Sequence, residues 1–162
     1  MNDSSINVSG CEHCWPSSAD AAWNARDGLT HTAELIDESH YHVMILACPQ
    51  CGQRFLSVFT EMIDWSDGDD AQYWTVVPVT ENEATELARR GSELTEIEIN
   101  SLGSGRRSLF RNYPTGEGPC EFWGKGITVG PMINYNSFKE ERTPLRGAAH
   151  GGGDAVDKFL RF

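Results

Sequence analysis

The chain has 162 residues with 39% hydrophobic residues, and its 24 acidic against 13 basic side chains give a formal net charge of −11. This length and composition allow a folded core and favour a folded protein over an intrinsically disordered one. No apolar run approaches the roughly 18 residues that span a bilayer. The first residues also lack the basic start and apolar stretch of a secretory signal. We therefore expect a cytoplasmic protein with no membrane association.

The charge is unevenly distributed along the chain. Residues 1–101 hold 18 acidic and 4 basic side chains, whereas residues 102–162 hold 6 acidic and 9 basic ones. The first region therefore carries −14 and the second +3. An acidic region of this kind repels nucleic acid and attracts a basic partner, although surface charge also simply keeps a small protein in solution.

The first elements in chain order are a short helix and an extended stretch. Ser17 or Ser18 can cap a helix that runs through Arg26, and Asp27-Gly28 ends it. From His31 to Ala47 the β-branched and aromatic residues favour strands. A bend at Glu38-Ser39 would divide this stretch in two.

Two further strands are predicted around an Asp-Gly turn. Alternating side chains from Arg54 to Trp65 indicate a strand with two different faces. Residues 66–69 (Ser-Asp-Gly-Asp) form a hairpin signal, and a strand from Tyr73 to Val79 follows. Because Pro78 cannot donate to a sheet ladder, this strand should end there or lie at an edge.

A second helix begins at a capping box, with Thr80 at the cap and Glu83 three residues later. It should end at Gly91. Residues 92–101 fit either a strand or an acidic helix. Beyond residue 103, glycine, proline and basic side chains indicate a loop-rich region, with a short helix at 154–160. We expect an α+β fold in which 1–101, an acidic β-rich region with one capped helix, packs with 102–162 as one domain.

Two cysteine pairs of the same spacing, Cys11-Glu-His-Cys14 and Cys48-Pro-Gln-Cys51, are the strongest chemical signal. In a reducing cytosol such pairs are more often metal ligands than disulfides. Thiolates suit a tetrahedral Zn²⁺ ion, and four of them leave no open position, so the site would be structural. Gly52 can adopt the positive φ that aims its N–H toward sulfur. Iron, a disulfide pair and free thiols are the alternatives.

These two motifs, with strands after the second, resemble the knuckles of zinc-ribbon and rubredoxin-like proteins. The resemblance covers residues 11–79 and implies that Cys11, Cys14, Cys48 and Cys51 ligate one zinc ion beside a small antiparallel sheet. The 33 residues between the pairs exceed the common spacing, so an inserted helix and strand must loop out. His13 lies inside the first knuckle and is a less suitable ligand.

No catalytic arrangement stands out. Cys120 lies between Glu117 and Glu121, which would raise rather than lower the pKa of its thiol. His40 and His42 flank one residue of a strand and could share a metal, but no third ligand stands at a recognisable spacing. An enzyme that uses Cys120 or a histidine site is therefore only an alternative.

We expect a non-catalytic, zinc-stabilised module that binds a basic protein. Its charge and size are similar to those of small acidic bacterial immunity proteins, and that resemblance implies an inhibitor of a basic toxin or enzyme. The candidate contacts are acids and tryptophans near the predicted turn: Asp64, Trp65, Asp67, Asp69, Asp70 and Trp74. The alternative is a nucleic-acid-binding or regulatory zinc ribbon that uses Arg106, Arg107, Arg111, Phe110 and Tyr113.

Overall fold

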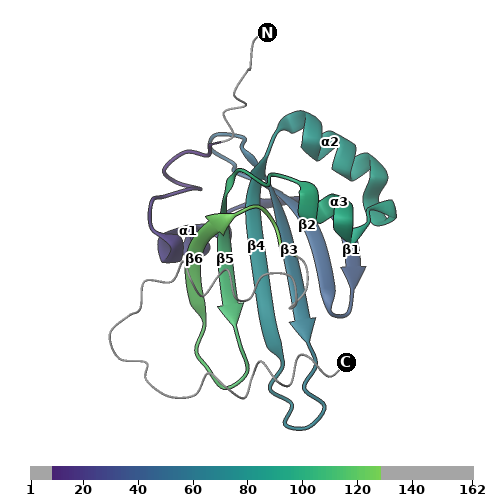
Figure 1. Cartoon of the computed structure of the whole chain (residues 1–162). Helices are drawn as coiled ribbons and strands as arrows, with labels where there is room; N and C mark the ends of the chain where they lie inside the picture. The colour runs from purple at the N-terminus through teal and green to yellow at the C-terminus, as the bar shows by residue number, and fades with distance from the viewer. Residues whose placement is uncertain (1–8, 129–162) are drawn as a thin grey trace.

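The computed structural model describes residues 9–128, which form one antiparallel six-stranded sheet with helices on both faces. The strands follow chain order β1-β2-β3-β4-β5-β6, so each strand pairs with its neighbour in sequence (Figure 1). Their bounds are β1 Thr30–Glu38, β2 Tyr41–Ala47, β3 Arg54–Met62, β4 Ala71–Val79, β5 Arg107–Tyr113 and β6 Cys120–Lys125. The helices are α1 Ala19–Arg26, α2 Glu81–Arg90 and α3 Glu96–Ser101, with a 3₁₀ turn η1 at Gly91–Glu93. The predicted α+β class is confirmed.

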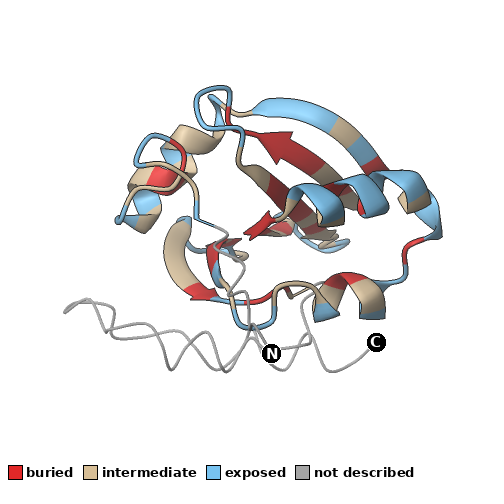
Figure 2. Cartoon of the chain, turned by 90° about the horizontal axis from the view of Figure 1, so that it is seen from above, coloured by how far each residue is buried: buried red, intermediate tan, exposed pale blue. Residues whose placement is uncertain are grey.

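Side-chain alternation along the strands creates two separate apolar layers. On one face, Leu56 and Val58 of β3 pack with residues of α2 and α3 such as Leu87 and Ile99. On the other face, Phe55 of β3 packs with residues of α1 and of the segment before it. Figure 2 shows α1 on one side of the sheet and α2 and α3 on the other, with buried residues concentrated in the strands.

The helix caps read from the sequence are confirmed. The Ser18 hydroxyl accepts the N–H of Ala21 at the start of α1. Thr80 and Glu83 form the reciprocal capping box of α2: the Glu83 N–H donates to Thr80 Oγ1 (3.1 Å) and the Thr80 N–H to Glu83 Oε2 (2.8 Å). Gly91 ends α2 with φ +52, a conformation that favours glycine.

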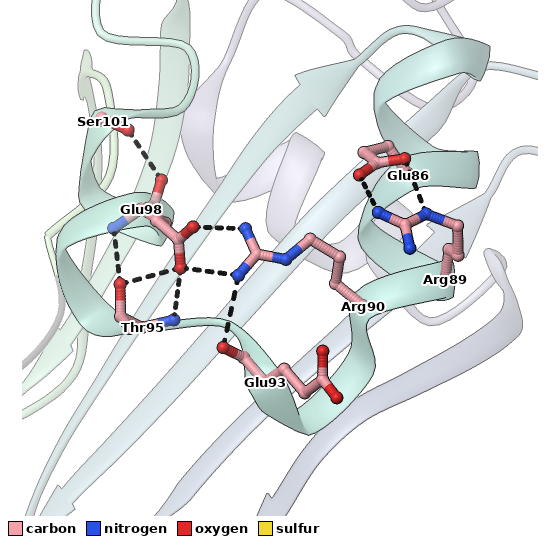
Figure 3. Close-up of polar contacts among 7 residues, drawn as sticks. All are labelled: Glu86, Arg89, Arg90, Glu93, Thr95, Glu98 and Ser101. Carbon is pink, nitrogen blue, oxygen red and sulfur yellow. Dashed lines mark hydrogen bonds and ion pairs between the residues drawn. The ribbon is translucent and has the colours of Figure 1, made fainter.

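The ambiguous stretch at residues 92–101 is helical rather than extended, because a second capping box nucleates α3. The Thr95 hydroxyl accepts the Glu98 N–H, and the Glu98 carboxylate accepts the Thr95 N–H. Both Arg90 guanidinium Nη atoms also donate to Glu98, so the end of α2 is tied to the start of α3 (Figure 3). These bonds lower the pKa of the Glu98 carboxyl to about 2, with the Arg90 hydrogen bond as the largest cause.

Beyond residue 103 the chain is more regular than the sequence indicated, because β5 and β6 extend the sheet from β4. Pro78 pairs with Phe55 on the β3 side, while on the β5 side the β4 ladder ends at Val76. Pro78 has no backbone N–H to donate, and it lies beyond the residues of β4 that pair with β5. On the β5 side, β4 is therefore an unpaired edge at Pro78, in agreement with the prediction from the sequence. The helix expected at 154–160 lies outside the described residues. In the described part of the chain, no helix is both long enough and apolar enough to cross a membrane.

Candidate metal centre and surface sites

Two tight turns bring the cysteine pairs together. The first pair precedes α1, and the Trp15 N–H donates to the Cys11 carbonyl oxygen (2.8 Å) to close its turn. The second pair lies in the connection between β2 and β3, where the Gly52 N–H donates to the Cys48 carbonyl oxygen (2.9 Å). Gly52 has the expected positive φ of +78, but its N–H meets this carbonyl oxygen rather than a sulfur.

The four sulfurs form a compact group that could hold a metal ion. All lie within 4.8 Å of one another. The Sγ–Sγ distances are 3.7 Å for Cys11–Cys14, 3.9 Å for Cys11–Cys48 and 3.7 Å for Cys14–Cys51. A tetrahedron with metal–sulfur bonds of about 2.3 Å has edges of about 3.8 Å. The donor set and its spacing therefore fit one tetrahedral ion, and the structure confirms that the four predicted cysteines lie together.

The environment of the cluster is asymmetric. Cys14 and Cys48 are buried, Cys11 is half-buried and Cys51 is exposed. Burial, reinforced by the neighbouring thiols, raises the pKa of Cys14 well above its usual range. At Cys51 desolvation acts in the same direction, but backbone hydrogen bonds with Gln53 and Cys11 outweigh it and lower the pKa to about 6. A metal ion bound here would displace the remaining thiol protons.

The other cysteine and histidine candidates lie outside this group. Among the described residues, the metal-compatible cluster contains the four cysteines and not the exposed His13. Cys120 begins β6, where its sulfur lies 3.9 Å from the Glu121 carbonyl oxygen. His40 and His42 contact separate carboxylates, because their Nδ1 atoms lie 3.1 Å from Glu61 Oε2 and 2.9 Å from Asp37 Oδ1.

The acidic residues near the predicted hairpin form an ordered turn between β3 and β4. Asp64 Oδ1 accepts the N–H groups of Ser66 (2.9 Å) and Asp67 (3.2 Å), and Asp70 Oδ1 accepts the Asp64 N–H (2.6 Å). These carboxylates therefore act as internal caps of the turn. We call residues 64–70 the acidic turn.

Side chains of the acidic turn also reach the β5–β6 connection and solvent. Asp69 Oδ2 accepts the Gly116 N–H, and the Asp69 carbonyl oxygen accepts the Thr115 hydroxyl, each at 2.6 Å. Within the turn, Trp65 is 85% exposed. The structure thus brings together five of the six candidate partner contacts.

Trp74 lies elsewhere, in an aromatic cluster on the α1 face of the sheet. Its ring centroid is 5.3 Å from Trp23 of α1 and 4.9 Å from Phe59 of β3. The Arg26 and Arg111 guanidinium groups lie over the Trp23 ring at 5.2 and 4.6 Å. The sequence reading missed this cluster, because only the strand register places Phe59, Trp74 and Arg111 side by side.

The basic residues near position 106 are dispersed by the fold. Arg106 donates two bonds to Glu83, and Arg111 donates to Glu121 at 2.7 Å. Phe110 is buried. Arg107 remains at the surface, 3.9 Å above the centroid of the Trp123 ring.

Comparison with known proteins adds no family to this description. No protein-family model, no curated protein and no solved structure matches the chain.

Proposed function

We propose that this protein is a non-catalytic module, stabilised by structural Zn²⁺, that binds a basic protein through its acidic turn. We assign Zn²⁺ to the four cysteines because this ion takes four thiolates in a tetrahedral shell and needs no further ligand. With four protein ligands the ion has no position for a substrate. Its binding free energy would then contribute to folding rather than to catalysis.

The observation that carries the partner proposal is the exposure of Trp65 within a turn that hydrogen bonds hold in shape. A tryptophan that is 85% exposed leaves a large apolar surface in water. The bonds of Asp64 and Asp69 fix the backbone around it, so binding costs little conformational entropy. Tryptophan is the residue type most enriched at interface hot spots, and the surrounding carboxylates favour a cationic partner.

The partner that we propose is a basic protein, and the acidic turn would cover its active site. The resemblance in charge and size to small acidic immunity proteins implies that this partner is a toxin or an enzyme. A nucleic-acid partner is less compatible, because Arg106 and Arg111 are already engaged with carboxylates.

Affinity capture from the native host with immobilised zinc-loaded chain tests this proposal. The bait is compared with Trp65→Ala, and two controls alter exposed residues far from the turn. Ile97→Ala removes an apolar side chain that is 81% exposed on α3, and Glu34→Gln removes one exposed charge on β1. We expect a basic protein to be retained by the wild type and both controls. Trp65→Ala should weaken its binding by roughly 30-fold or more.

Association kinetics with the captured protein test the charge argument. The on-rate should fall steeply as salt rises, because screening shortens the range of attraction between the two surfaces. Equal retention by Trp65→Ala, or an on-rate that salt does not change, would contradict the proposal.

A further inference from the structure

The two apolar layers of the sheet differ in their relation to the cysteine centre. The layer under α2 and α3 contains no cysteine; its members include Leu56, Val58, Val77, Leu87 and Ile99. The layer on the other face contains Cys14 and Cys48 together with Ala22, Leu46, Phe55, Val76 and Leu109. A metal ion would therefore be integral to one layer only.

The described chain before β1, residues 9–29, lies over this second layer, and we call it the cover. Its Trp15 ring lies 5.0 Å from Phe55 and 4.9 Å from Trp123. Trp123 Nε1 donates to the Ser17 carbonyl oxygen at 2.8 Å. The cover thus contacts the sheet near both β3 and β6.

Further along the cover, α1 continues the contact across the same face. Trp23 packs edge-on against Trp74, and Arg26 Nη2 donates to Ser57 Oγ at 3.1 Å. Only Ala22 of α1 is buried. An isolated eight-residue helix is marginal in water, so α1 depends on these tertiary contacts.

Besides these packing contacts, two junctions hold the cover to the rest of the described chain. Its covalent junction is with β1, which pairs with β2 at one edge of the sheet formed by residues 9–128. The cysteines supply the second junction, since Cys11 and Cys14 of the cover lie 3.9 and 3.7 Å from Cys48 and Cys51 of the β2–β3 connection. An ion bound to all four would crosslink the cover to the sheet 37 residues further along the chain.

We infer that the metal ion controls access to the α1 face of the sheet: when the ion is lost, the cover detaches as a unit while the sheet, α2 and α3 stay folded. Detachment exposes a band of aromatic and aliphatic side chains that includes Phe55, Trp74, Val76 and Trp123. The acidic turn lies at the other end of β3 from the cysteine turn, so it should keep its shape. This inference rests on metal binding and is independent of the proposed partner.

Hydrogen exchange measured by mass spectrometry on the full chain, zinc-loaded and after EDTA treatment, tests the inference. We expect amides of residues 9–29 to exchange about 100-fold faster or more without zinc. The reason is that the cover could then open by itself, which costs less free energy than unfolding the whole domain. Amides of β3, β4 and α2 should keep their protection. Tryptophan emission should shift to longer wavelength as Trp15, Trp23, Trp74 and Trp123 meet water, and added zinc should reverse both changes.

Matched cysteine variants separate the ion from the thiols. Cys11→Ser should give the exchange pattern of the EDTA-treated chain, whereas Cys120→Ser, which changes a cysteine outside the cluster, should behave as wild type. Three results would overturn the inference: loss of protection across β3, β4 and α2 together with the cover, unchanged protection of α1 after zinc removal, or full protection of α1 in a purified chain that contains no metal. None of these depends on whether Trp65 binds a partner.

Discussion

Two glutamates of α2 form similar ion pairs in unequal surroundings, and a comparison of the two measures what burial and the capping box add together. Glu83 and Glu81 both accept two guanidinium bonds from arginines of other elements, Arg106 and Arg54. The Glu83 side chain is 28% exposed and also closes the α2 capping box, whereas Glu81 is 68% exposed. The isosteric changes Glu83→Gln and Glu81→Gln therefore remove the same charge from unequal surroundings.

We expect Glu83→Gln to lower the free energy of unfolding by about 2 kcal/mol. The glutamine amide nitrogen would face a guanidinium donor, so one charge-assisted bond, typically about 1.5–3 kcal/mol, is lost. The capping box is also weakened, while residual solvent access reduces both effects. Glu81→Gln should cost less than about 1 kcal/mol, because exposed ion pairs contribute little. Urea unfolding at pH 7 with excess zinc in every sample measures both values.

The pH dependence provides a second measurement on the same pair. The Arg106 hydrogen bond is the largest cause that holds the pKa of Glu83 below its usual value of 4.5. A carboxyl whose pKa is lower in the folded state stabilises the protein above its unfolded pKa. That stabilisation is lost as the pH falls from about 4.5 through the folded value. The stability difference between wild type and Glu83→Gln should therefore shrink as the pH falls over this range. Equal costs for the two variants at pH 7 would refute the reasoning.

The remaining predictions concern α3 and the first cysteine turn. Ile99 is fully buried, whereas Ile97 on the same helix is 81% exposed. In urea unfolding, Ile99→Ala should therefore lower the free energy of unfolding by about 2–5 kcal/mol and Ile97→Ala by less than about 0.5 kcal/mol. Similar values for the two variants would place Ile99 outside the core. A Cβ at Gly10 would lie 2.5 Å from the Cys14 sulfur, so Gly10→Ala should weaken zinc binding roughly 10-fold or more in a chelator competition. Gly105→Ala, where a Cβ meets nothing within 4 Å, is the control, and an unchanged zinc affinity for Gly10→Ala would contradict the geometry.

Local signals in the sequence predicted much of the fold, because each depends on residues a few positions apart. Hydroxyl and carboxylate side chains at Ser18, Thr80 and Glu83 supply caps that the backbone N–H groups need at any helix start. Alternation along β3 predicted which side chains share a face. The repeated Cys-x-x-Cys spacing predicted the metal-compatible cluster, because thiolate preference and turn geometry are properties of the motif itself.

The sequence also contains a local signal for α3 that did not by itself distinguish a helix from a strand. Thr95 and Glu98 have the spacing of the Thr80–Glu83 capping box, yet Ile97 and Ile99 also suggested a strand. Burial of Ile99 between α3 and the sheet, together with the Arg90–Glu98 contact, decides for the helix. The aromatic side chains of β4–β6 gave no comparable signal, since their partners come from other strands, from α1 and from the segment before α1.

Sequence alone determined which chemical groups this protein carries: four thiols in two matched Cys-x-x-Cys motifs, an acidic first region and a tryptophan among carboxylates. Only the tertiary structure decided which charged side chains remain available to a partner, because strand register and helix packing pair Arg106 with Glu83 and Arg111 with Glu121. Other long-range contacts pack Trp74 against Trp23 and Phe59, away from the acidic turn, and hold the cover across one face of the sheet. These contacts join residues ten or more positions apart in the chain, and no local pattern encodes their distances.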